Sequence, residues 1–182
     1  MLRRKQFLIS SIFLALFLSG CSQSSTGPAN TNAPPAQQNL PANFAPVSSL
    51  NFVKADAAAA QIPAGGSGEA IVRLTVQNGY HVNANPPTYT YLKATELTVQ
   101  AADSLSVGFV TYPTAVTKKF SFAQKPLAVY EGEVPIKVML KAAAAGGKTS
   151  ENLAASLNVQ ACDDQVCYPP GRLDISIPVV IK

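Results

Sequence analysis

The sequence predicts an all-β domain, an antiparallel β-sandwich, over residues 48–182. Apolar and polar residues alternate with a period of two along several segments, as in strands with one buried face. Clusters of Gly, Pro and Asn separate these segments and predict turns. About eight such segments in roughly 135 residues favour a sandwich, with a closed barrel as the structural alternative.

Residues 1–20 have the pattern of a bacterial export signal. Basic residues at 3–5 precede an apolar stretch at 7–18, which is shorter than the about 20 apolar residues of a membrane-spanning helix. The sequence Leu-Ser-Gly directly before Cys21 resembles the lipobox of bacterial lipoproteins, which implies lipidation of Cys21. An ordinary signal peptide followed by a chance cysteine is the alternative.

The segment from Cys21 to residue 47 is expected to be a disordered tether. It contains no charged residue and five prolines, so its apolar surface is too small to offset the entropy of ordering. A flexible chain of this length spans about 25–30 Å root-mean-square. Ser22, after the acylated cysteine, favours the outer membrane over the inner by resemblance to enteric lipoproteins. Attachment would be through lipid alone.

The basic charge of the chain does not indicate a nucleic-acid partner. The formal net charge is +4, but three of the 14 basic residues and none of the 10 acidic residues precede Cys21. The mature protein therefore has 11 basic and 10 acidic residues and no basic patch for phosphate. The two lysines at 118–119 are expected in a solvated turn.

Three segments alternate most regularly and predict the longest strands. Every second residue is apolar at 70–76, 134–140 and 173–181. Shorter runs predict further strands at 50–53, 97–99, 105–110, 120–122 and 153–159. Alanine runs at 57–60 and 142–145 suggest single helical turns that do not change the fold class.

Cys162 and Cys167 remain as thiols in an exported, oxidising setting. Five steps along a straight strand cover about 17 Å, whereas a disulfide needs Cα atoms about 4.4–6.8 Å apart. Asp163 and Asp164 are suitable turn residues, and the two prolines after the pair prevent a helix from continuing. We therefore expect a tight loop with the two sulfurs facing across its base.

Three roles are open for this cysteine pair. A structural disulfide in so short a loop would stabilise the fold by only about 2 kcal/mol. A redox pair in a small surface loop would let an incoming thiol reach a sulfur in line. A metal site is disfavoured, because zinc needs about four ligands and only His81 is on hand to join the two cysteines.

The segment from Gln160 to Pro170 resembles the active-site segment of the N-terminal periplasmic domain of the thiol:disulfide interchange protein DsbD. Residues 79–85 and 129–132 resemble further stretches of that family, and the resemblance covers roughly residues 48–182. It implies an immunoglobulin-like sandwich. It also implies transfer of reducing equivalents from a membrane-embedded carrier to periplasmic thioredoxin-like proteins.

The resemblance implies roles for individual residues. Cys162 and Cys167 would be the redox pair, with Cys167 forming the mixed disulfide with a partner. His81 and Asn83 fall where the family has polar or aromatic residues beside the sulfurs. Phe122 would be the aromatic ring of a cap loop that shields them.

Three further neighbours flank the pair. Asp163 and Asp164 place negative charge beside Cys162 and would raise the pKa of its thiol, so the pair would be activated by docking or attacked as a disulfide. His81, if close, would offset these carboxylates. Tyr168 would pack over the disulfide.

The function that the resemblance implies is a standalone, lipid-anchored interchange module with protein-disulfide reductase activity and neither cofactor nor metal. The full-length family protein adds a transmembrane bundle and a thioredoxin-like domain, neither of which is expected here, so a separate transmembrane carrier would supply electrons. Some family members have five residues between the cysteines, whereas this chain has four. The alternative is a non-catalytic binding or scaffold lipoprotein with a structural disulfide. A hydrolase is disfavoured, because the chain has one His and no nucleophile elbow.

Overall fold

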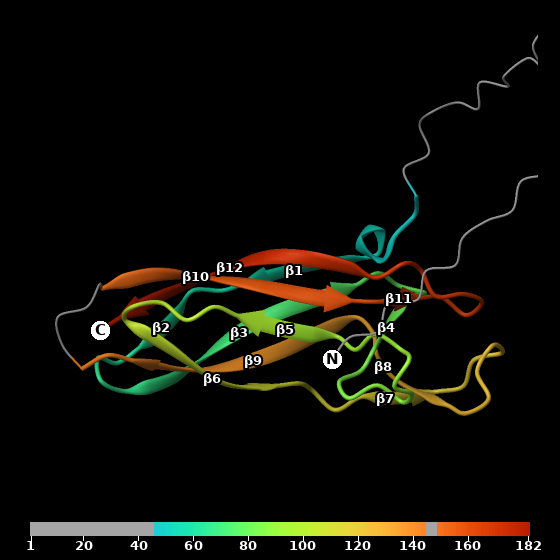
Figure 1. The fold of residues 1–182 in the computed structure, drawn as a ribbon, viewed down its shortest axis with the longest axis horizontal. Coiled ribbons are helices and arrows are strands. Elements are labelled where there is room, and N and C mark those ends of the chain that lie inside the picture. Colours follow the sequence, from blue (N-terminus) through green and yellow to red (C-terminus); the bar gives the residue numbers. More distant parts are fainter. Residues whose placement is uncertain (1–45, 145–148) are drawn as a thin grey trace, which may run out of the picture. The chain divides into compact units, whose positions relative to one another are not determined.

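The computed structural model describes residues 46–144 and 149–182. The predicted signal peptide, Cys21 and all but the last two residues of the predicted tether lie outside this part. Within it, the chain forms twelve strands and one 3-10 helix, η1 (Ser49–Asn51), and the strands make three four-stranded sheets (Figure 1). None of the helical structure in these ranges is long and apolar enough to cross a bilayer.

Two of the sheets, A and B, contain the long strands. Sheet A has the order β1-β3-β9-β6, with bounds Val53–Ala57, Ser67–Val76, Glu133–Ala142 and Leu105–Thr111. Sheet B has the order β2-β12-β10-β5, with bounds Ala60–Ile62, Gly171–Ile181, Ser150–Val159 and Glu96–Val99. Neighbouring strands are antiparallel, except that β2 runs parallel to β12.

Sheets A and B enclose one hydrophobic core, and Figure 1 shows β10 and β12 above β3 and β9. The central strands bury every second side chain, as the alternation in the sequence predicts. Side chains exposed by at most 1% include Val72, Leu74, Ile136, Val138, Leu140, Leu153, Leu157, Ile177 and Val179. Burying one such side chain contributes about 1.5–3 kcal/mol. The predicted immunoglobulin-like β-sandwich is thus confirmed, and none of these sheets closes into a barrel.

Sheet C is short and extends the sandwich at one end. Its order is β11-β4-β8-β7, with bounds Ala161–Cys162, His81–Asn83, Leu127–Tyr130 and Val116–Lys118. Three of its strands adjoin long strands in the chain: β3 leads into β4, β8 into β9, and β10 into β11. Gly79 and Gly132, with φ of 85° and 63°, make two of these connections. The rigid sandwich therefore fixes where sheet C lies.

The strand predicted at 50–53 is wrong in its first part, because the chain forms η1 there and β1 begins only at Val53. The backbone N–H of Ser48 donates to Oδ1 of Asn51 (2.8 Å), and the backbone N–H of Ser49 donates to the carbonyl of Pro169 (3.0 Å). These bonds satisfy backbone donors locally, and residues such as Ser and Asn favour such turns over strands.

Two other short predictions are also wrong. The alanine run at 57–60 is not helical, because its ends are extended and pair with β3 and β12. The run at 120–122 is a turn rather than a strand, with the backbone N–H of Ala123 donating to the carbonyl of Phe120 (3.3 Å). The first residue of the alanine run at 142–145 is the last residue of β9, and residue 145 lies outside the described ranges.

Candidate functional site

Cys162 and Cys167 form a disulfide across the base of a tight loop. Cys162 ends β11, and the two residues face each other in an isolated antiparallel bridge with Cα atoms 3.9 Å apart. The S–S distance is 2.04 Å. The expected tight loop with the two sulfurs joined across its base is therefore present, although its Cα separation is shorter than the expected range. The redox role of the pair stays a prediction.

The carboxylate of Asp163 organises the loop between the two cysteines. Its Oδ1 accepts the backbone N–H groups of Gln165 (2.7 Å) and Val166 (2.8 Å), and its Oδ2 accepts the hydroxyl of Tyr168 (2.7 Å). The backbone N–H of Asp163 donates to the carbonyl of Val166 (2.9 Å). These donors favour the ionised carboxylate and lower the pKa of Asp163, the Tyr168 hydroxyl most strongly.

The two cysteines differ in burial. Cys162 has no exposed surface, whereas Cys167 is half-buried. Thiol–disulfide exchange requires direct approach of one sulfur to another. Cys167 is therefore the more accessible of the two residues for an incoming partner.

His81 lies directly opposite Cys162, because β4 pairs with β11 in a register that joins these two residues. Directly opposed side chains of an antiparallel pair have Cβ atoms about 4.5–5.5 Å apart and project from the same face. The imidazole is fully buried and stacks on the ring of Phe120, with centroids 4.1 Å apart. Neither ring nitrogen has a hydrogen-bond partner within the described part of the chain.

The charges around His81 act in opposite directions. Burial lowers the pKa of His81 most strongly, and the positive charge of Lys118 lowers it further. Glu131, Asp164 and Asp163 raise this pKa without reversing the shift. The lowered pKa favours the neutral imidazole at neutral pH, so the idea that His81 offsets the loop carboxylates stays a prediction.

Asn83 is a buried anchor for the neighbouring segment. Its Nδ2 donates to the carbonyl of Lys93 (3.0 Å) and to Oε1 of Gln160 (3.2 Å), and its carbonyl accepts the hydroxyl of Thr95 (2.7 Å). Nε2 of Gln160 in turn donates to the carbonyl of Tyr168 (3.4 Å). Asn83 is thus connected to the cysteine loop through Gln160, a role that no local sequence pattern predicts.

Tyr168 packs beside two other aromatic rings. Its ring centroid lies 4.5 Å from that of Phe52 and 6.1 Å from that of Tyr80, and the rings of Phe52 and Tyr80 are themselves stacked at 3.9 Å. The bond to the Asp163 carboxylate raises the pKa of the Tyr168 hydroxyl to about 12. The ring therefore packs the loop against Phe52 and Tyr80, the residues directly before β1 and β4.

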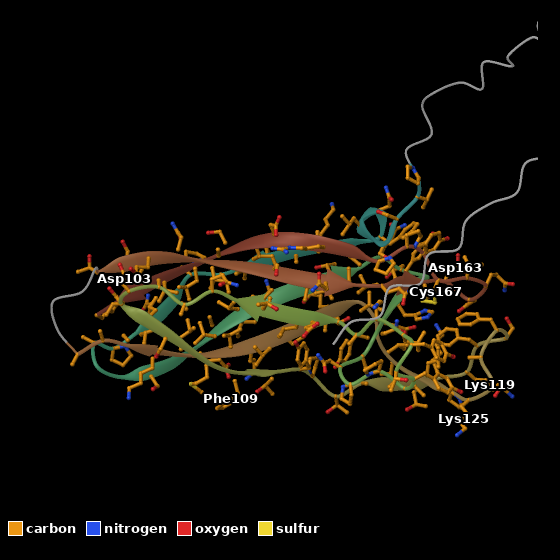
Figure 2. All side chains as sticks on the ribbon, viewed as in Figure 1. Asp103, Phe109, Lys119, Lys125, Asp163 and Cys167 are labelled. Carbon is orange, nitrogen blue, oxygen red and sulfur yellow. A yellow bond between two sulfur atoms is a disulfide. The ribbon has the colours of Figure 1, made fainter. Side chains whose placement is uncertain are left out.

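The loop at 119–126 lies beside the cysteine loop, and Figure 2 shows Lys119 and Lys125 at the same end as Asp163 and Cys167. Oγ of Ser121 donates to the carbonyl of Asp164 (3.3 Å), which joins the two loops. The ring packed against His81 belongs to Phe120, which is 3% exposed. Phe122 is 42% exposed and stacks on Phe120, with ring centroids 5.3 Å apart.

Lys118 is not part of a solvated turn, contrary to expectation. It ends β7, and its Nζ lies 2.8 Å from Oε1 of Glu131 and 3.8 Å from Oδ1 of Asp164. The same ammonium lies 5.5 Å from the centroid of the Phe120 ring.

Within the described ranges, no three His, Cys, Asp or Glu residues are grouped so that they could hold a metal ion.

Comparison with known proteins identifies the family. The family model described as "Thiol:disulfide interchange protein DsbD, N-terminal" matches residues 50–177. No curated protein sequence matches the chain.

Two solved structures are similar to the described fold. The DsbD N-terminal domain of Neisseria meningitidis in the reduced form is 23% identical, with a TM-score of 0.42 over 69% of this chain and 83% of that chain. The N-terminal periplasmic domain of ScsB from Proteus mirabilis is 17% identical, with a TM-score of 0.45 over 69% of this chain and 44% of that chain. Because the family match spans residues 50–177 and includes both bonded cysteines, the chain belongs to the family of the N-terminal domain of thiol:disulfide interchange protein DsbD.

Proposed function

We propose that the chain is a thiol:disulfide interchange module that passes reducing equivalents through Cys162 and Cys167 to periplasmic thioredoxin-like proteins. A lipid on Cys21 would anchor it at the periplasmic face of the envelope, and a separate transmembrane carrier would reduce it. The observation that carries the proposal is the unequal burial of one disulfide, with Cys162 enclosed and Cys167 accessible.

The exchange has two steps. In the reduced protein, the thiolate of Cys167 attacks one sulfur of a partner disulfide, and the other partner sulfur leaves with the electron pair. The sulfur of Cys162 then attacks Sγ of Cys167, and the second partner sulfur leaves. Two electrons pass to the partner, and the Cys162–Cys167 disulfide of the structure is the product.

The hydrogen bonds of the loop argue against a purely structural disulfide. Asp163 already holds the loop through the backbone of Gln165 and Val166 and through the hydroxyl of Tyr168. A covalent bond that closes so short a loop adds only about 2 kcal/mol in the chain-entropy model. A readily broken and re-formed bond in an already shaped loop is suited to exchange.

The surroundings of Cys167 favour activation by docking. The loop that joins the two cysteines carries the exposed carboxylate of Asp164. Its negative charge would disfavour a thiolate in this loop, so the free protein would react slowly with unspecific disulfides. Val166 and Phe122 present apolar surface from the two adjacent loops, 51% and 42% exposed. A partner that covers them would also exclude water from the reacting sulfurs.

The reduction potential of the pair tests this proposal. The full chain carrying Cys21→Ser is equilibrated with graded thiol buffers, and the fraction oxidised is measured by alkylation and mass. A potential between about −180 and −270 mV is expected for an exchange protein. A value below about −300 mV would indicate a structural disulfide and favour the scaffold lipoprotein. The Cys162→Ser/Cys167→Ser double variant is the control that shows no transition.

A further inference from the structure

His81 is a buried polar side chain whose imidazole nitrogens make no hydrogen bond in the described part of the oxidised structure. Both of its nitrogens are enclosed and lack a hydrogen-bond partner in the described ranges. Buried polar atoms are nearly always paired in native proteins, and each exception needs an explanation. The stacked ring of Phe120 covers one face of the imidazole, and Cys162 is its directly opposed neighbour on β11.

Cys162 needs a proton acceptor during exchange. The thiolate, and not the thiol, is the attacking species, so Cys162 must lose its proton before it can attack Cys167. Its side chain has no exposed surface, so bulk water does not reach it directly. Asp163 follows it in sequence, and burial and negative charge both raise the pKa of a thiol.

We propose that His81 is the proton acceptor for Cys162 in the step that closes the disulfide and releases the partner. The inference rests on the proposed exchange function. The Cys162 S–H bond breaks, and its proton passes to an imidazole nitrogen of His81. The Cys162 sulfur uses the freed electron pair to bond with Sγ of Cys167, while the bond from Cys167 to the partner breaks. The partner sulfur leaves as a thiolate, and the imidazolium then returns the proton to solvent or to that thiolate.

The groups that face His81 suit this role. Burial and Lys118 on β7 lower the pKa of the imidazole and keep it in the neutral, accepting form at neutral pH. Glu131, which follows β8, and the loop carboxylates of Asp163 and Asp164 act in the opposite direction. These three negative charges would stabilise the imidazolium while it exists. A thiolate beside an imidazolium is also more stable than an isolated buried thiolate.

The test separates the two chemical steps with Ellman's reagent, a small aromatic disulfide. The full chain carrying Cys21→Ser is reduced and mixed with one equivalent of the reagent in a stopped-flow instrument, from about pH 5 to about pH 9, around the ordinary pKa of histidine. Attack by Cys167 releases a first coloured thiolate, and closure by Cys162 releases a second. Cys162→Ser is the control that releases only the first.

The variant His81→Phe keeps an aromatic ring against Phe120 and removes the proton acceptor. We expect it to leave the rate of the first release unchanged and to slow the second by about a hundredfold or more at neutral pH, in the range of general-base effects. The rate of its second release should then rise with pH as the Cys162 thiol ionises without help from an imidazole. His81→Gln, a polar replacement that cannot take up the proton, should behave in the same way and serves if His81→Phe does not fold.

Two results would overturn the inference. One is closure by the His81 variants at the original rate and with the original pH dependence. The other is a Phe120→Leu variant whose second release is slowed as much as in the His81 variants and has the same pH dependence. Loss of packing alone would then explain the effect. If the chain with His81 intact never releases the second thiolate, the proposed exchange function itself fails, and the inference fails with it.

Discussion

The side chain of Asp163 controls the conformation of the cysteine loop through its charge. One carboxylate accepts two backbone N–H groups and the hydroxyl of Tyr168. All three bonds are stronger with the ionised carboxylate than with the protonated acid. The loop geometry is thus coupled to the protonation of this one residue.

Protonating Asp163 should therefore destabilise the folded protein in acid. The folded pKa is lowered below the ordinary value of about 4. A group of this kind contributes stability that is fully present above its unfolded pKa and is lost as the pH falls through the folded pKa. We expect the melting temperature to fall below about pH 4 less steeply in Asp163→Ala than in the unmodified chain.

Asp103→Asn is the matched control, since Asp103 is an exposed residue of another turn. Its acid profile should match that of the unmodified chain. Identical acid profiles for Asp163→Ala and the unmodified chain would show that the hydrogen bonds of Asp163 do not stabilise the fold. Differential scanning calorimetry across the acid range measures all three proteins.

Single residues differ in how far their positions could be predicted from sequence. Asp163 was expected in a turn because its side chain bonds to nearby backbone, which is a local property. The contact of Phe120 with His81 joins residues far apart in the chain, and no local pattern contains it. The resemblance implies Phe122 as the ring of the cap, whereas Phe120 is the ring that packs against His81.

At the scale of elements, the long strands were predictable and the short ones were not. β3 and β9 each have ten residues, long enough for alternation to identify the buried face. β4 has three residues, all buried, and β11 has two, so neither shows a period. Their pairing is determined by the long strands that adjoin them, and sheet C could not be predicted from sequence.

The four-residue cysteine spacing forms a complete turn. Residues 163–166 reverse the chain with a backbone bond between their first and last members, 2.9 Å from nitrogen to oxygen. Cys162 and Cys167 then face each other as an antiparallel bridge. Four residues are therefore sufficient to close this loop without further chain.

The short helix η1 connects both ends of the cysteine loop to the start of the domain. The buried hydroxyl of Ser49 accepts the backbone N–H of Ala161 (2.8 Å) and donates to the carbonyl of Pro169 (2.8 Å). These two backbone groups lie just before Cys162 and just after Tyr168. Ser49 therefore ties down the segment that carries the disulfide.

Replacing Ser49 should weaken this connection measurably. In Ser49→Ala the carbonyl of Pro169 keeps the backbone N–H of residue 49 as a donor, but the buried N–H of Ala161 loses its acceptor. An unsatisfied buried donor costs about 1–3 kcal/mol, so we expect a loss of this size in the free energy of unfolding in urea. Ser106→Ala, which removes an exposed hydroxyl on β6, should change the free energy of unfolding by at most about 0.5 kcal/mol. Equal effects of the two changes would contradict the assigned role.

At the scale of the described domain, most of the hydrophobic core and the proposed site lie in different sheets. Sheets A and B contain the alternating apolar side chains of the core, while sheet C contains His81 and Cys162. The disulfide joins residues five apart and does not connect sheet A to sheet B. The fold should therefore tolerate breaking and remaking this bond, which a module for exchange requires.

Reduction of the disulfide should accordingly leave the fold intact. We expect the full chain carrying Cys21→Ser to unfold in urea as one cooperative transition in both redox states, with the reduced form less stable by about 2 kcal/mol or less. The slope of free energy against urea should be unchanged, because it reports the surface exposed on unfolding. Leu157→Ala, which empties a fully buried position on β10, should cost about 2–5 kcal/mol and calibrates the contribution of the core. If the reduced protein lost its cooperative transition while Leu157→Ala kept it, the disulfide would be essential for folding, and the structural role would be favoured over exchange.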